Sequence, residues 1–348
     1  VKLDPDGRIL WQRTTTHDDI CEIYSVAESG DGAVIVAGVI RNEGNADAWV
    51  LKLDGDGNAL WQKAIDRGDM EVASAVLDFG EEHVLIAGSY LSPPEQIVLW
   101  IVEFDSDGNQ VRGNAVSDYS FMLIEFSIHE SLAKSPDGGF YLMWGLKTTG
   151  RTDVQHMSIM KFDGGGTMPW IKTLRQGWGS SLSACSDGGA VVAGGKYFQT
   201  NGTYDIWIVR LDADGNVLWD NMFGSARSDW ATSIVEDGGG GFLVSGHTEA
   251  AGDANIFLAR TDADGRPLWQ RKIGGSNYAN PASAVETRDG HVLLAGTGAI
   301  GYENEDIWIA KLDGNGEIGE GCSLIDELES YDEDSYYEGE YVTTPSDF

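Results

Sequence analysis

Residues 211–219 read Leu-Asp-Ala-Asp-Gly-Asn-Val-Leu-Trp, and variants of this stretch recur along the chain. Successive copies begin 50, 51, 58, 49, 50 and 51 residues apart, a regularity that chance does not produce. The 348-residue chain is therefore built from an internal repeat of roughly fifty residues. The copies begin at Leu3, Leu53, Phe104, Phe162, Leu211, Thr261 and Leu312.

Each copy has the chemistry of a hairpin between two β-strands. An alternating run such as 206–210 (Ile-Trp-Ile-Val-Arg) precedes it, and a short apolar run that usually ends in Trp follows. Branched and aromatic residues favour strands, whereas Asp bonds local backbone amides and Gly takes the positive-φ position of the turn. The stretch therefore predicts an antiparallel pair, which we number as the third and fourth strands of each repeat.

A second hairpin lies between successive copies of the first. In the fourth repeat it reads Ser-Asp-Gly-Gly at 186–189, followed by the apolar run Ala-Val-Val-Ala-Gly at 190–194. A continuous apolar strand is typical of burial on both faces. Four strands per repeat, repeated six times, predict an all-β fold, namely a β-propeller of four-stranded antiparallel blades. A solenoid also repeats, but its coils are shorter and need atypical caps, which this sequence lacks.

Six blades are preferred, with seven as the alternative. The sequence has six pairs of first and second strands but seven copies of the other hairpin, and the last copy, at 313–316, has no Trp after it. The spare amino-terminal strand at 9–12 is expected to complete the last blade, because closing the ring removes free sheet edges. Residues 1–7 then have no evident place. In a seven-bladed ring the carboxy-terminal tail would have to supply two strands.

Composition separates a propeller, residues 1–322, from an acidic tail, residues 323–348. The tail has nine Asp or Glu residues and no Lys or Arg. Segments this dense in one charge usually stay disordered. The alternative is a tether or a strand donated to a neighbour, for which 341–344 (Tyr-Val-Thr-Thr) is the best-suited stretch.

The net charge of −33 argues against nucleic acid as a partner, since phosphate binding needs a basic face. A high-salt setting or calcium would screen such charge. No stretch approaches the ~20 apolar residues that span a bilayer as a helix. Cys21, Cys185 and Cys322 match no metal motif, and either Cys322 bridges one of the others or all three are small buried side chains.

The acidic hairpins offer closely spaced oxygen atoms, which calcium prefers. Calcium takes six to eight oxygen ligands, and longer motifs add an acid at the ninth or twelfth position. Counting nine residues from the first Asp reaches an acid in one copy only. The predicted calcium site is therefore Asp212, Asp214, Asn216 and Asp220, and the alternative is a plain turn. We predict no required cofactor, with calcium as the one ion that these loops suit.

The sequence presents no catalytic constellation. The six histidines share no common position in the repeat, and no Gly-x-Ser-x-Gly motif is present. Asp47, Asp205 and Asp306 do recur just before third-strand Trp residues. Recurrence at equivalent positions indicates a structural role, so we predict that the protein is not an enzyme.

Nine of the twelve Trp residues occupy repeated positions and are expected to pack between blades. Trp144, Trp178 and Trp230 fall outside that register. We predict that these three are exposed contact residues. Because Trp stacks on sugar rings, they favour carbohydrate as an alternative ligand.

The unit Asp-x-Trp-Val-x-Lys-Leu-Asp-x-Asp-Gly-Asn-x-Leu-Trp-Gln resembles the tandem repeats of prokaryotic secreted and cell-surface propeller proteins, over residues 1 to about 322. Its hairpin is also similar to the tryptophan-docking hairpin of pyrroloquinoline-quinone-type propellers, which typically have Thr-Gly in place of Asp-Gly-Asn. The resemblance implies an extracellular or cell-surface location. It assigns no function, because propellers host many.

The sequence thus favours a non-catalytic propeller that binds another protein, or its own copies, as an interaction or assembly scaffold. One alternative is a carbohydrate-binding module. A second is an enzyme of quinoprotein or glycosidase type.

Overall fold

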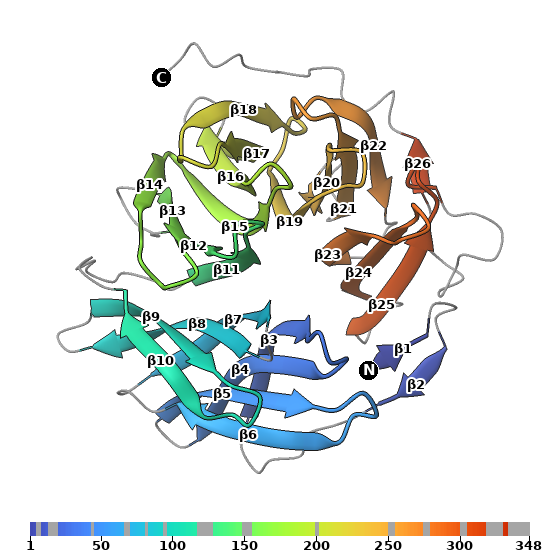
Figure 1. The fold of residues 1–348 in the computed structure, drawn as a ribbon. Helices are drawn as coiled ribbons and strands as arrows, with labels where there is room; N and C mark the ends of the chain where they lie inside the picture. Colours follow the sequence, from blue (N-terminus) through green and yellow to red (C-terminus); the bar gives the residue numbers. More distant parts are fainter. Residues whose placement is uncertain are drawn as a thin grey trace. The chain divides into compact units, whose positions relative to one another are not determined.

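The computed structural model describes residues 1–4, 8–12, 20–42, 45–65, 70–80, 83–92, 96–116, 128–147, 155–198, 202–249, 255–273, 279–299, 305–317 and 330–332. Every regular element in these ranges is a β-strand, and neighbouring strands pair as antiparallel hairpins (Figure 1). The predicted fold is confirmed: the chain is an all-β propeller of six blades.

Blades one to four each have four strands that pair in sequence order. Blade one contains β3 (Ile20–Glu28), β4 (Val34–Asn42), β5 (Asn45–Leu53) and β6 (Ala59–Ile65). Blade two contains β7 (Glu71–Gly80), β8 (His83–Ser92), β9 (Gln96–Phe104) and β10 (Gln110–Ala115). Blade three contains β11 (Ile128–Lys134), β12 (Phe140–Lys147), β13 (Gln155–Phe162) and β14 (Trp170–Arg175). Blade four contains β15 (Gly177–Ala184), β16 (Ala190–Phe198), β17 (Thr203–Leu211) and β18 (Val217–Phe223).

The last two blades depart from this pattern. Blade five has β19 (Asp229–Glu236), β20 (Phe242–Thr248), β21 (Asn255–Thr261) and β22 (Pro267–Ile273), and a fifth strand, β26 (Ser330–Asp332), pairs with β22. Blade six, in the described residues, has β23 (Ala279–Glu286), β24 (Val292–Ala299) and β25 (Glu305–Leu312). The part of the tail expected to form a strand, 341–344, lies outside the described residues. Within the described residues, the tail forms a strand at Ser330–Asp332.

The amino terminus forms a two-stranded sheet of β1 (Lys2–Leu3) and β2 (Ile9–Trp11). Residues 2 and 3, to which the sequence assigned no position, therefore pair with the spare amino-terminal strand. Trp11 donates its indole N–H to the carbonyl of Gly55 in blade one at 2.8 Å, as Trp61 of blade one does to Ser106 of blade two. β2 thus stands where the fourth strand of a preceding blade would stand. That this strand completes blade six remains a prediction.

The chain divides into two compact units on either side of Lys134, and each has its own core. In both, the second and third strands of blades one to five are buried, as their continuous apolar sequences predict, whereas buried and half-buried residues alternate along β24 of blade six. One cluster in the first unit joins blades one and two through residues such as Ile86 and Trp100. One cluster in the second unit joins blades four and five through residues such as Val244 and Phe257.

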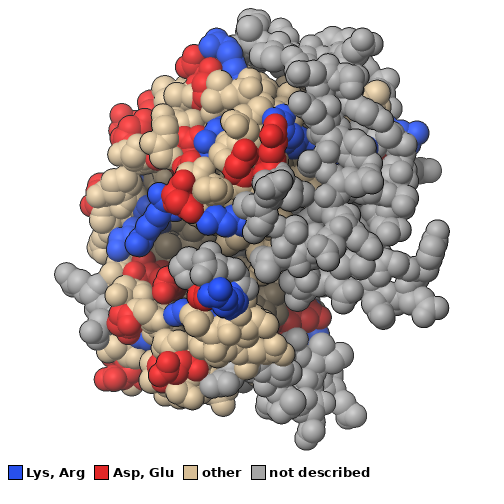
Figure 2. All heavy atoms as spheres, turned by 90° about the vertical axis from the view of Figure 1, so that its right-hand side faces the viewer, with Lys and Arg blue, Asp and Glu red and all other residues tan. Residues whose placement is uncertain are grey.

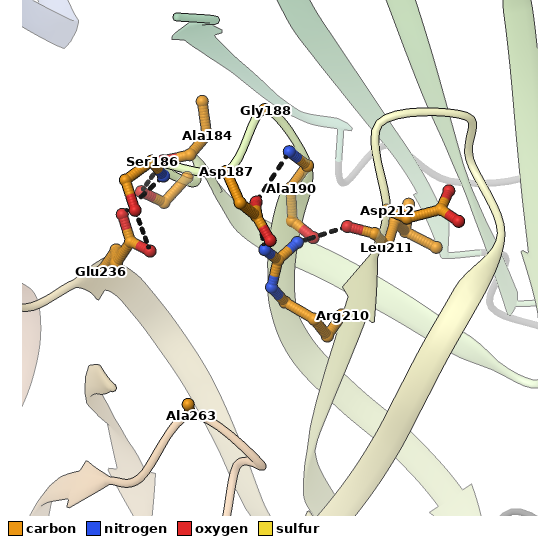
Figure 3. A network of polar contacts seen from close by, with 12 residues as sticks. Ala184, Ser186, Asp187, Gly188, Ala190, Arg210, Leu211, Asp212, Glu236 and Ala263 are labelled. Atoms are coloured by element: carbon orange, nitrogen blue, oxygen red, sulfur yellow. Dashed lines mark hydrogen bonds and ion pairs between the residues drawn. The ribbon is translucent and has the colours of Figure 1, made fainter. Parts of the chain in front are cut away.

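A basic residue near the end of the third strand ties down the turn between the first and second strands. In blade four, the buried Arg210 lies 2.6 Å from Asp187 and also donates to the backbone carbonyls of Ala190 and Leu211 (Figure 3). The adjacent Ser186 donates through its backbone N–H to Glu236 of blade five, at 2.7 Å. The partners of the buried Arg210 all lie within the fold, so this residue has a structural role. Equivalent ion pairs join Lys52 to Asp31, Lys161 to Asp137 and Lys311 to Asp289.

Candidate functional site: the outer strands of the blades

The hairpin predicted to bind calcium is a closed turn. One carboxylate oxygen of Asp212 accepts the backbone N–H groups of Asp214 and Asn216, at 3.0 and 2.8 Å. Its other oxygen accepts the side-chain amide of Asn216 at 2.9 Å. Hydrogen bonds from Asn216 lower the pKa of the Asp212 carboxyl. N–H groups of the turn itself therefore bind the carboxylate of Asp212.

Asp220 lies apart from this turn, which corrects the predicted ligand set. It belongs to β18, pairs in register with Val209, and accepts the indole N–H of Trp207 at 3.1 Å. The chain direction explains the difference, because a strand carries the residues after the turn away from it. Within the described residues, no group of three or more His, Cys, Asp or Glu side chains is arranged to hold a metal ion.

The three Trp residues outside the repeat register are placed differently from the prediction. Trp144 and Trp178 are only 2% and 7% exposed, so the expectation that they are exposed is corrected. Trp144 lies on the apolar second strand β12, and Trp178 packs against Gly195. Trp230 is half-buried and stacks on His247, with ring centroids 4.1 Å apart. Their sequence positions misled because the burial of Trp144 and Trp178 depends on packing against neighbouring strands, which the register of the repeat does not show.

The sequence did not decide whether the three cysteines form a disulfide or are buried thiols. Cys185 is a free thiol, and it is buried. Burial raises the pKa of this thiol to about 12, so it is inert at neutral pH. Cys322 and the side chain of Cys21 lie outside the part of the chain that the structure describes.

The acidic turns, the tryptophans and the cysteines are now assigned. One repeated feature remains, and it lies on the fourth strands. The fourth strands β6, β10, β18 and β22, and the amino-terminal strand β2, each begin with a β-bulge, whereas β14 pairs without one. In β18, Trp219 pairs with Arg210 and Val217 with Leu211, which leaves Leu218 as the extra residue. A bulge re-aims the inserted side chain, and here it turns the leucine to solvent. The extra residues Leu10, Leu60, Val111, Leu218 and Leu268 are 59%, 55%, 50%, 53% and 64% exposed.

Sequence reasoning missed these residues, although a signal was present. A leucine precedes Trp in four copies of the hairpin, at Leu10, Leu60, Leu218 and Leu268. In a regular strand, neighbouring side chains point to opposite faces, so the leucines had to face away from the buried side of the Trp. We call this repeated set the outer-strand leucines.

The outer edge of one fourth strand is occupied. β26 pairs antiparallel with β22, so that Arg271 faces Asp332, Lys272 faces Tyr331 and Ile273 faces Ser330. The pairing lies beyond the bulge at Leu268, where β22 is regular. Arg271 packs its guanidinium over the ring of Trp269, 5.5 Å from the centroid. Blade five therefore offers a regular edge of basic sequence, and the acidic tail adds a strand to it.

Charge elsewhere on the surface is dispersed. On the described part of the face in Figure 2, acidic atoms occur in several separate groups with Lys and Arg between them. No single acidic field dominates that view. The described residues also include no helix of the length and hydrophobicity needed to cross a bilayer.

No family model and no curated protein matches this sequence. Among solved structures, an ulvan lyase from a new family of polysaccharide lyases, bound to a GlcA–Rha3S saccharide, aligns with a TM-score of 0.53. It is 12% identical over 86% of this chain and 80% of the lyase. A glucose dehydrogenase aligns at 0.47 and 10% identity, over 85% of this chain and 97% of its own. The Dos1 propeller also aligns at 0.47, with 12% identity over 87% of this chain and 71% of its own.

At these identities, the likeness to the lyase concerns the fold alone. The six blades described above define the class of protein as a β-propeller. The class includes enzymes and interaction scaffolds, so the function has to be argued from this chain's own surface.

Proposed function

We propose that the protein is a non-catalytic scaffold, at the cell surface or outside the cell, that binds protein chains by adding strands to the outer edges of its blades. Its own copies are among those chains. The single observation that supports this most is the seating of β26 on β22. A fourth strand that accepts one added strand presents the main-chain geometry for others.

The physical basis is the unpaired row of N–H and C=O groups on an edge strand. An added strand satisfies these groups, and side chains on either side supply specificity. The outer-strand leucines lie at the start of each such edge and add apolar area beside it. The bulge that holds each leucine prevents pairing at that end, so added strands are directed to the regular half beyond it.

The carbohydrate alternative loses most of its support, because Trp144 and Trp178 have no exposed ring face. Trp230 stacks on His247 through one face, which leaves little of it for a sugar. Protein binding through the outer strands rests on a repeated, exposed feature instead.

The first prediction tests strand addition with a synthetic peptide of residues 323–348. Tyr331→Pro in the full chain should release β26, because Pro lacks the N–H that a ladder needs. We expect the labelled wild-type peptide to bind the Tyr331→Pro chain at least about tenfold more tightly than the wild-type chain, where β26 competes in cis. Fluorescence anisotropy measures both affinities.

The matched control is the same peptide carrying Tyr331→Pro, which differs in one residue and keeps the charge. It should bind neither chain. If both peptides bind equally, the attraction is electrostatic and the proposal of strand addition is wrong. If neither binds the Tyr331→Pro chain, the edge is not an acceptor.

A further inference from the structure

Two carboxyl groups face one another at the junction of blades four and five, inside the second compact unit. Asp205 lies near the start of β17, and Asp229 is the first residue of β19. Between them runs the connection from β18 to β19. A side chain at Gly224 would meet Asp205 Oδ1 and Asp229 Oδ2, each at 2.8 Å. The chain at Gly224 therefore passes close to both carboxyl groups.

Asp229 is buried and Asp205 is half-buried, and the hydrogen bonds of the two carboxyl groups are incomplete. Asp229 is fully buried. Its Oδ2 accepts the backbone N–H of Ser225 at 2.5 Å and the Ser225 hydroxyl at 2.9 Å, and the Thr248 hydroxyl also bonds this carboxyl. Oδ1 of Asp229 and Oδ1 of Asp205 are both buried without a donor. Two carboxylate oxygens out of contact with water and without donors are costly when charged.

The neighbouring strands supply no cation to this pair in the described residues. Lys196 on β16 pairs in register with Asp205, but its ammonium lies over the Trp207 ring, 5.0 Å from the centroid. Glu249 after β20 adds negative charge near Asp229, and Asp220 on β18 acts on Lys196. The other titratable groups on these elements include His247, which stacks on Trp230, and Arg227, exposed in the connection. They also include Tyr197 and Tyr204, whose rings contact each other, and Arg210 and Glu236, which bond to the turn between β15 and β16.

Two like charges so placed cannot both be held at low cost, and one of them takes up a proton. Burial, reinforced by the Asp229 charge, raises the pKa of Asp205 to about 6. Burial also raises the pKa of Asp229. Calcium would need six to eight oxygens. Here the described side chains offer two carboxyls and two hydroxyls.

We propose that Asp205 and Asp229 share one proton that joins blade four to blade five, and that its loss as pH rises loosens this junction. An acid whose pKa is higher in the folded state stabilises the fold fully below the unfolded value. That stability is lost as pH rises through the folded value. For Asp205, this stability is lost between about pH 4 and about pH 6. Above about pH 6, the folded state bears the full cost of two charged carboxylates.

The test compares thermal unfolding of the full chain at about pH 5 and pH 8, in wild type and in Asp205→Asn. Asn keeps the shape of a protonated Asp and cannot ionise. We expect the wild-type midpoint to fall by about 4 °C more than that of Asp205→Asn between the two pH values. The control is Asp214→Asn, which removes the same charge from an exposed turn and should keep the wild-type slope.

Equal slopes in wild type and Asp205→Asn would overturn the proposal. So would a rise in the wild-type midpoint with calcium at pH 8 that Asp205→Asn lacks, because the pair would then be a cation site. Should Asp205→Asn fail to fold, proton release on unfolding of the wild type at about pH 5 decides. The shared proton predicts about one proton released for this pair, and proton uptake would contradict it.

Discussion

At the scale of single residues, the contact between blades is a tryptophan set against a turn. Trp170 donates its indole N–H to the carbonyl of Ala213 at 2.9 Å, and its ring lies over Gly215. Trp219 repeats this arrangement with Ala263 at 3.1 Å. The indole needs a partner when it is half-buried, and the glycine leaves room for the ring. The repeat therefore fixes the spacing of neighbouring blades within each unit.

A prediction at this scale separates ring contact from backbone strain. Gly215 has φ of 82°, and a Cβ there would stand 2.9 Å from the Trp170 ring. Gly138 has φ of 85°, and a Cβ there would meet nothing within 4 Å. Both substitutions place Ala at a positive φ that glycine adopts more readily. The difference between the two losses of stability therefore measures the contact with the Trp170 ring. We expect Gly215→Ala to lower the free energy of unfolding by about 1–2 kcal/mol more than Gly138→Ala in urea denaturation.

Equal losses in the two variants would mean that the ring moves aside freely. The indole would then add nothing to the spacing of the blades. A larger loss for Gly138→Ala would contradict the account outright.

At the scale of the elements, the fourth strand has two roles on two faces. Its Trp packs against the next turn, while the bulged leucine before it faces solvent. Natural sheets usually protect an edge by bulges or charge. Here the bulge protects one half of the strand and leaves the other half regular. A bulged fourth strand is thus suited to pair with an added strand along its regular half.

The outer-strand leucines give a prediction at this scale. The triple variant Leu60→Gln, Leu218→Gln and Leu268→Gln should reduce self-association measured by sedimentation velocity. Stability should change by less than about 0.5 kcal/mol per site, because the side chains are exposed. Val26→Gln is the control, since Val26 is 65% exposed on a first strand.

If the control variant reduced association as much as the triple variant, any exposed apolar residue would serve. The outer strands would then have no special role. Unchanged association in the triple variant would remove the leucines from the proposed surface.

At the scale of the whole molecule, the repeat determined most of what could be predicted. Regular spacing identified the hairpins, and apolar runs identified the buried strands, because both depend on residues close in sequence. The meeting of Asp205 with Asp229 could not be read in this way. It depends on how one blade packs on the next. The same limit explains Trp144 and Trp178, whose burial follows from neighbouring strands rather than from their own register.

The tail shows a second limit. Its acidic composition indicated a segment apart from the propeller, and 341–344 had the better strand propensity. Residues 341–344 lie outside the described residues, and the strand that the described residues show is Ser330–Asp332, against the basic sequence of β22. Where an added strand pairs is decided by the edge that receives it, and a propensity calculated from the tail alone omits that edge.

Hydrogen exchange at β22 tests the central claim, that an outer edge accepts a strand, most directly. In the wild-type chain, amides in 271–273 should exchange more slowly than those in 221–223, the equivalent end of β18, whose sheet has no fifth strand among the described residues. Tyr331→Pro should abolish the difference and leave 221–223 unchanged. Equal exchange of the two segments in the wild type, or slow exchange at β22 that persists in Tyr331→Pro, would contradict the account.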